Sequence, residues 1–260
     1  MSSEKVAIVT GASSGIGAAT VRALADSGFT VIATARREDR LKDLAAESAS
    51  IHPFAADLTH DHDVDSLIAF ARQYKPSLIV HAVGGAFDAN SIMDADIASW
   101  QKSYEVNVIS GVRLIKAALP MLKDSPDSQI ILITSTAGHV AYENGGSNVA
   151  AKFAEKSLAN TLRLELNGLP IRISEIAPGM VKTDEFALNR FGGDSAKAAA
   201  VYEGVDAPLT ADDVAEAIRW SATLPAHFNV DSMIIRPTAQ AANHKVARTT
   251  RYVARVESVA

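Results

Sequence analysis

The sequence contains no cysteine, and this single absence removes several kinds of chemistry. Disulfide bonds, thiolate metal sites and cysteine nucleophiles are all excluded. A chain without thiols also fits a reducing compartment, and we expect the protein to be cytoplasmic.

Long apolar runs are missing as well. No stretch approaches the roughly 20 apolar residues that cross a bilayer. Residues 1–5 lead into an apolar strand without the pattern of a secretory signal. We therefore expect no membrane partner.

An excess of positive charge is a further missing feature. The formal net charge is −5 and the pI is about 5.8, so nucleic acid is not expected as a partner. The 260 residues hold 48% apolar and 21% charged side chains, and this balance predicts a folded domain with a sizeable core.

Short apolar runs alternate along the chain with longer amphipathic stretches. The pattern predicts strands at 6–10, 30–35, 51–56, 78–83, 129–134, 171–176 and 233–236, and helices at 18–27, 38–48, 63–73, 100–122, 149–167 and 211–223. Strands that alternate with helices form parallel βαβ units. We therefore predict a single α/β domain with a doubly wound, Rossmann-like parallel sheet of about seven strands.

The domain organisation follows from the same pattern. Residues 1–240 are expected to form one dinucleotide-binding domain. Its segment 184–209 carries no strand signal and lies where a substrate loop is expected. Residues 241–260 are polar with scattered Arg and Lys, and we interpret them as a C-terminal arm or tail.

A glycine-rich loop joins the first strand to the first helix. Gly11, Gly15 and Gly17 allow the backbone to approach a ligand closely, and the helix that follows offers free amides to a phosphate. An ordinary strand-to-helix turn is the alternative, but the strand before and the helix after the loop favour dinucleotide binding. The predicted contact surface also includes three other loop residues: Ser13, Ser14 and Ile16.

The second strand ends at Arg36 and Arg37. A site for NAD places an acidic residue at this point, whereas an arginine suits the 2′-phosphate of NADP. A solvated basic turn is the alternative. Because the phosphate loop precedes it, we predict NADP as the cofactor and a phosphate contact at Arg36, with Arg37 beside it.

Further motifs follow in a fixed order. They are the loop TGASSGIG at 10–17, Asp57 after the third strand, Asn107 in a long helix, Ser135 after the fifth strand, Lys152, and PGMVKT at 178–183. In this order they resemble the short-chain dehydrogenase/reductase family along nearly the whole chain. Within the family, the sequence looks most like NADP-dependent members that act on small hydroxy acids or alcohols.

The resemblance implies contacts to the cofactor. Asp57 and Leu58 would meet its adenine side, and Ala82 and Gly84 would border it after the fourth strand. The nicotinamide end would be held by residues of the later motif: Pro178, Gly179, Val181 and Thr183. The family needs no metal, so the His and Asp residues at 60–63 are interpreted as a solvated helix start.

The resemblance also implies a catalytic group of Asn107, Ser135, a tyrosine and Lys152. In the family the tyrosine exchanges a proton with the substrate oxygen, which the serine polarises. The lysine lowers the pKa of the tyrosine and binds the nicotinamide ribose. The asparagine backbone supports a water chain to the lysine.

This chain departs from the family at the tyrosine. The position four residues before Lys152 holds Asn148, and one helical turn places the two on the same face. A phenol next to an ammonium exchanges protons near neutral pH, whereas a carboxamide does not. Losing a general acid or base typically slows a reaction by about 10²–10⁴-fold. Asn148 can still donate a hydrogen bond to a carbonyl or hold a water that relays to Lys152.

Two further positions bear on this departure. His81 and Ala82 stand where the family usually has two asparagines, and we interpret His81 as a structural residue. Tyr142 and His139 lie near the missing tyrosine in sequence but off the Lys152 helix face, so neither is favoured as the proton donor. Tyr142 is instead expected to line the substrate pocket with Ser135, Asn148 and Phe186.

The main hypothesis is a slow NADP(H)-dependent oxidoreductase that acts on a small carbonyl or hydroxyl substrate. One alternative is a silent NADP-binding protein that serves as a sensor or an oligomer partner. Another is an active enzyme inactivated by substitution at residue 148. The resemblance also implies a homotetramer or homodimer formed through the two long helices at 100–122 and 149–167.

Overall fold

The computed structural model describes residues 5–249. Its main feature is a seven-stranded sheet in the order β3-β2-β1-β4-β5-β6-β7, in which every pair of neighbouring strands is parallel. The strands are β1 (Lys5–Thr10), β2 (Phe29–Ala35), β3 (Ile51–Ala55), β4 (Leu78–His81), β5 (Ser128–Ile133), β6 (Ile171–Pro178) and β7 (Ser232–Ile235). The predicted single Rossmann-like domain is confirmed.

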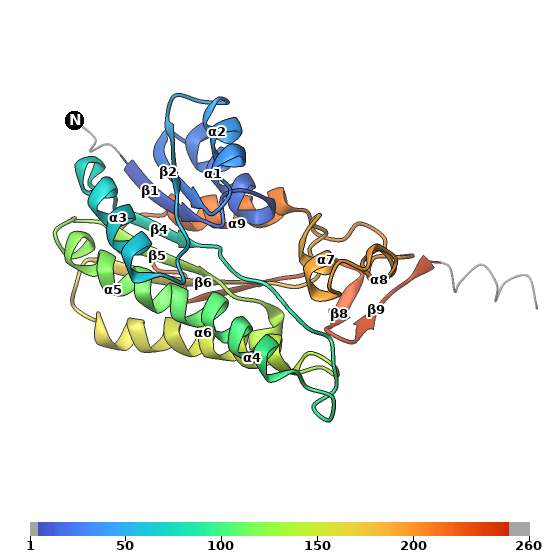
Figure 1. Ribbon diagram of the computed structural model, residues 1–260. Coiled ribbons are helices and arrows are strands. Elements are labelled where there is room, and N and C mark those ends of the chain that lie inside the picture. Colours follow the sequence, from blue (N-terminus) through green and yellow to red (C-terminus); the bar gives the residue numbers. More distant parts are fainter. Residues whose placement is uncertain (1–4, 250–260) are drawn as a thin grey trace, which may run out of the picture.

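Helices cover both faces of the sheet (Figure 1). One layer holds α1 (Gly15–Asp26), α2 (Glu38–Ala45) and α9 (Ala211–Ala222); the other holds α3 (Asp61–Ala71), α4 (Ile97–Tyr104), α5 (Ser110–Lys123) and α6 (Gly146–Glu165). Short 3₁₀ turns, η1 (Arg72–Tyr74) and η3 (Thr136–Gly138), follow α3 and β5. Each layer has its own apolar core, so the sheet is buried on both sides.

The helix predicted at 100–122 is interrupted. A π-helical segment, η2 (Glu105–Ile109), separates α4 from α5. Asn107 provides the reason, because its side-chain Nδ2 donates to the carbonyl of Ser103 at 2.7 Å. In a regular α-helix, the carbonyl of Ser103 would instead accept from the backbone N–H of Asn107. The side chain of Asn107 also exchanges hydrogen bonds with the backbone of Gly85, in the segment after β4.

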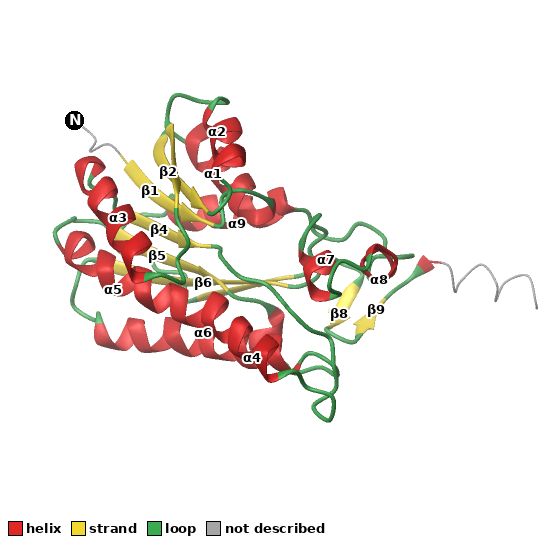
Figure 2. Ribbon diagram, viewed as in Figure 1, coloured by secondary structure: helices red, strands yellow, loops and turns green. Residues whose placement is uncertain are grey.

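Small elements gather beyond the carboxyl ends of the strands. They are α7 (Phe186–Arg190), α8 (Ser195–Ala200) and the antiparallel ribbon of β8 (Gln240–Ala242) and β9 (Lys245–Val246), which Figure 2 shows set apart from the main sheet. The predicted substrate loop at 184–209 contains α7 and α8. Of the arm or tail predicted at 241–260, residues 250–260 lie outside the described part, and the domain division stays a prediction. None of the helices within residues 5–249 combines the length and apolarity needed to cross a bilayer.

Candidate active site

A long cleft opens at the carboxyl edge of the sheet, above β1 and β4. The strand order reverses at β1, and such switch points are where open α/β sheets bind their ligands. The cleft consists of two adjoining cavities of about 770 Å³ and 490 Å³, volumes typical of small-molecule sites. The larger one contains the phosphate loop, and the smaller one contains the predicted catalytic group. Both are bordered by Ile16, Ala82, Val83, Gly84, Gly85, Thr183 and Phe186.

Glycines set the shape of the phosphate loop. A Cβ at Gly11 would lie 2.7 Å from the carbonyl oxygen of Ala82, and one at Gly17 would lie 2.2 Å from that of Gly11. Ser14 occupies the N-cap position of α1 but makes no side-chain bond to the first turn. The amides at this helix start are therefore not capped by a side chain, an arrangement that suits a phosphate group.

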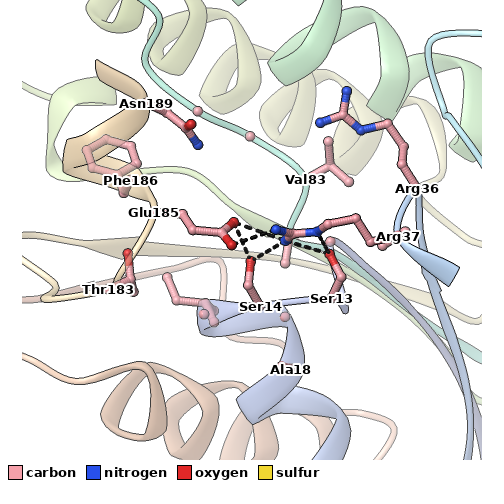
Figure 3. A pocket seen from close by; sticks show the side chains of 18 of the residues that line it. Ser13, Ser14, Ala18, Arg36, Arg37, Val83, Thr183, Glu185, Phe186 and Asn189 are labelled. Atoms are coloured by element: carbon pink, nitrogen blue, oxygen red, sulfur yellow. Dashed lines mark hydrogen bonds and ion pairs between the residues drawn. The ribbon is translucent and has the colours of Figure 1, made fainter. Parts of the chain in front are cut away.

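Arg37 lies against this loop (Figure 3). Its Nη2 donates to Ser13 Oγ at 2.8 Å and to Ser14 Oγ at 2.9 Å. It also forms a two-point ion pair with Glu185, with Nη1–Oε1 at 2.5 Å and Nη2–Oε2 at 3.0 Å, while Arg40 reaches the same carboxylate at 2.6 Å. The bonds from Arg37 are the main reason why the pKa of Glu185 falls to about 2.

Arg36 takes a different direction from Arg37. Figure 3 shows its side chain turned away from the Arg37 cluster. Burial alone would raise the pKa of Asp57, but hydrogen bonds from Thr59 and the charge of Arg36 outweigh it and hold that pKa below its usual range. Both arginines line the larger cavity, so either could contact a bound phosphate. Of the two, Arg37 is the one that forms hydrogen bonds to the phosphate loop.

Lys152 is buried and lines the smaller cavity. Its Nζ lies 2.6 Å from Glu155 Oε2 and donates to the carbonyl of Ile133 at 3.3 Å. A Cβ at Gly84 would lie 3.1 Å from this Nζ and 2.7 Å from Asn107 Oδ1. The absence of a side chain at Gly84, after β4, therefore leaves space for the side-chain ends of both Lys152 and Asn107.

Asn148 lies on the same face of α6, one turn before Lys152, and is buried. Its Nδ2 donates to the hydroxyl of Tyr142 at 3.0 Å, and its Oδ1 has no hydrogen-bond partner within residues 5–249. Ser135 Oγ donates to the carbonyl of Pro178 at 3.3 Å and accepts from the amide of Ala137. Ser135, Tyr142, Asn148 and Lys152 all line the smaller cavity.

His81 is fully buried at the carboxyl end of β4. Thr10 Oγ1 lies 3.2 Å from its Nδ1, and Ser110 Oγ lies 3.5 Å from its Nε2. Burial, together with the charge of Lys152, lowers the pKa of His81 to about 4, so the ring is neutral near pH 7. Thr10 also accepts from the amides of Ala82 and Val83, and this ties down the strand end where the family uses asparagine.

The smaller cavity carries charge of one sign. Its charged side chains are Lys152, Arg190 and Arg248, joined by His244, and no acidic side chain is among the described residues that line it. Arg190 lies over the Tyr142 ring, with its guanidinium carbon 5.3 Å from the ring centroid.

Gln240 accepts from the amide of Met180 at 2.7 Å and so joins β8 to the segment after β6.

Nearly every predicted site residue borders the cleft, the exception being Asn107, which is fully buried. Their roles stay predictions. Four further residues at the site were not predicted from the sequence: Arg40, Glu155, Glu185 and Arg190. Only Glu155 had a local signal, because it follows Lys152 at the i,i+3 spacing of a helix.

The fold and the cleft define a Rossmann-type α/β protein with a ligand site at the switch point of its sheet. The family model described as short chain dehydrogenase matches residues 5–190. The chain is 45% identical over 238 residues to an uncharacterized oxidoreductase of Mycobacterium tuberculosis, covering 92% of this chain and 93% of the relative. It is 32% identical over 238 residues to an NADP-dependent 3-hydroxy acid dehydrogenase of Escherichia coli, covering 90% and 96%.

A solved structure gives the same result. The closed form of a serine dehydrogenase complexed with NADP+ superposes with a TM-score of 0.88 and 32% identity, covering 94% of this chain and 100% of that one. The chain belongs to the short-chain dehydrogenase/reductase family. The resemblance noted from the sequence motifs is thereby confirmed.

Proposed function

We propose that this protein is an NADP(H)-dependent oxidoreductase for a small carbonyl or hydroxyl substrate. The observation that carries the proposal is the continuous cleft, which has Arg37 and the glycine loop in one cavity and Ser135, Asn148 and Lys152 in the next. The bound nicotinamide would supply or accept the hydride. The 2′-phosphate fits the cluster at Arg37, since a guanidinium binds phosphate at two points. The relatives whose names state NADP support this choice.

We propose further that the substrate carries an acidic group. Lys152 is paired with Glu155, but Arg190 and Arg248 give the substrate cavity positive charge that no lining carboxylate offsets within the described residues. A carboxylate is the natural partner of such a cavity, because arginine binds it at two points. The 3-hydroxy acid named for the E. coli relative has this chemistry.

A second candidate, a protein that binds NADP without hydride transfer, is supported by Asn148. The amide at this position cannot exchange a proton. The test is NADPH oxidation by the purified protein with aldehydes and ketones that carry or lack a carboxylate, and NADP reduction with the corresponding alcohols. Turnover that disappears in Ser135→Ala and Lys152→Ala supports the enzyme. NADPH binding without turnover across the panel supports the silent protein.

We also propose that the protein assembles as a homodimer or homotetramer through α4, α5 and α6. Five large apolar side chains on these helices are exposed to solvent: Ile97, Tyr104, Val112, Phe153 and Leu164. Exposed apolar surface of this kind is typical of protein interfaces. Light scattering on the purified chain and on Phe153→Arg tests this, and a parent that is a monomer contradicts it.

A further inference from the structure

The substrate cavity needs a proton donor that position 148 does not supply. Reducing a carbonyl group requires one proton for its oxygen, and an amide side chain has none to give. Among the described residues that line the cavity, the phenol groups belong to Tyr142 and Tyr202. These two hydroxyls differ in their hydrogen bonds, and the difference distinguishes their possible roles.

The hydroxyl proton of Tyr202 is already engaged in a hydrogen bond within the protein. Its hydroxyl donates to the carbonyl of Val181 at 2.9 Å, and burial raises its pKa above the ordinary value of 10.0. Tyr142 has the opposite arrangement, because its hydroxyl oxygen accepts a hydrogen bond from Asn148 Nδ2 at 3.0 Å. The proton of Tyr142 is therefore not used in its bond to Asn148.

We propose that Tyr142 is the general acid of this site and replaces the tyrosine missing at position 148. The proposal rests on the oxidoreductase function proposed above and identifies its proton donor. Asn148 is the residue that places the phenol, since its short side chain ends one hydrogen bond away from the Tyr142 oxygen. Tyr142 then belongs to the same cavity as Ser135 and Lys152, although it precedes α6 in the chain.

The surrounding residues make room for this placement. A Cβ at Gly145 would lie 2.3 Å from one carbon of the Tyr142 ring and 2.5 Å from another, so the ring packs where no side chain can stand. Arg190 lies over the ring and donates to the carbonyl of Asn144 at 3.2 Å. The ring is held between the start of α6 and the end of α7.

The proton balance of the step is simple. When a hydride reaches the carbonyl carbon from the reduced nicotinamide, the O–H bond of Tyr142 breaks and its proton forms the new hydroxyl. The phenolate left behind keeps the hydrogen bond from Asn148 Nδ2, which stabilises its negative charge. Solvent water at the open cleft returns the proton. The alcohol oxidation runs through the same groups in reverse.

The first experiment compares kcat/KM in the parent, Tyr142→Phe, Asn148→Tyr and the double variant. Tyr142→Phe is expected to lower kcat by about 10²-fold or more. Asn148→Tyr in the Tyr142→Phe background restores turnover, because it supplies a phenol at the family position. Tyr74→Phe, outside the cleft, is the matched control and keeps parental activity. A double variant as slow as Tyr142→Phe alone overturns the proposal, since a purely structural role for Tyr142 predicts that result.

A second experiment needs no cofactor. Tyr142→Phe and Asn148→Ala each remove the same hydrogen bond, so their urea unfolding midpoints should shift non-additively in the double variant. Additive shifts overturn the proposal, because they show that the two side chains do not interact. A parent that turns over and is unaffected by Tyr142→Phe overturns this proposal alone. A parent that transfers no hydride overturns the proposed function as well.

Discussion

Lys152 and Glu155 form an ion pair inside the protein, with Nζ and Oε2 at 2.6 Å and both side chains buried one turn apart on α6. Removing one partner of such a pair leaves an uncompensated charge and is strongly destabilising. Glu155 thus gives Lys152 a counter-charge beside the substrate cavity, in a chain whose residue 148 offers the lysine no phenol. The pair also has a consequence for pH dependence.

Glu155→Gln is expected to flatten the pH dependence of stability between about 4.5 and about 7. Burial raises the pKa of Glu155 from 4.5 to about 7, with Lys152 opposing and Glu175 adding to the shift. The folded state therefore holds this proton more firmly than the unfolded state. The resulting contribution is complete below 4.5 and is lost as the pH rises through about 7. Urea unfolding across this range measures it, with the exposed Glu165→Gln as control. An unchanged slope in Glu155→Gln contradicts the assignment.

His81 gives the opposite slope. Burial and Lys152 lower its pKa from 6.5 to about 4, so the unfolded state binds the proton more readily. Its contribution to stability is present above 6.5 and is lost as the pH falls through about 4. His81→Asn, which keeps a hydrogen-bonding side chain, should lessen acid destabilisation in this range. The exposed His227→Asn is the control, and equal acid sensitivity of parent and His81→Asn would falsify the prediction.

Gly17→Ala should weaken NADPH binding by at least about tenfold. The new Cβ would lie 2.2 Å from the carbonyl oxygen of Gly11, so the backbone of the phosphate loop must move. Ala23→Gly is the matched control, because it alters the same helix by one methyl group away from the loop. It should lower stability by about 1 kcal/mol and leave the Kd for NADPH unchanged. Fluorescence titration measures both Kd values, and equal affinity of Gly17→Ala and parent contradicts the prediction.

Glu185→Gln should tighten NADPH binding more than NADH binding. Glu185 holds Arg37 through two contacts, so a 2′-phosphate has to compete with its carboxylate for the guanidinium. The pair is about one-third exposed, and pairs of this kind contribute up to about 1 kcal/mol, which corresponds to a gain of up to roughly fivefold. Asp184→Asn, which removes a neighbouring charge that makes no bond to Arg37, is the control. Weaker NADPH binding in Glu185→Gln would instead assign Glu185 to the cofactor contact itself.

The parts of the site that were predictable depend on local spacing. The glycines of the phosphate loop lie between a strand and a helix, and residues 148 and 152 are one turn apart, so both follow from the order of residues in the chain. The choice of Arg37 over Arg36 at the loop was not predictable. It depends on Glu185, which lies 148 residues further along the chain.

Tyr142 illustrates the same limit. From the sequence, Tyr142 is not favoured as the proton donor because it lies off the Lys152 helix face, and in the structure it precedes the start of α6 at Gly146. The Tyr142 hydroxyl nevertheless lies 3.0 Å from Asn148 Nδ2. Helix periodicity does not predict this contact, because Tyr142 is not part of the helix. The interruption of the helix at η2 is similar, because the competing bond from Asn107 to Ser103 depends on the environment of one side chain.

The contact between His81 and Gly111 restricts the order in which the chain can change. A Cβ at Gly111 would come within 3.0 Å of His81 Nε2, between β4 and the first turn of α5. An alanine at 111 therefore has room only if the imidazole shifts by a few tenths of an ångström. A smaller side chain at 81 removes this contact, so a substitution at 111 costs less stability after position 81 has changed than before.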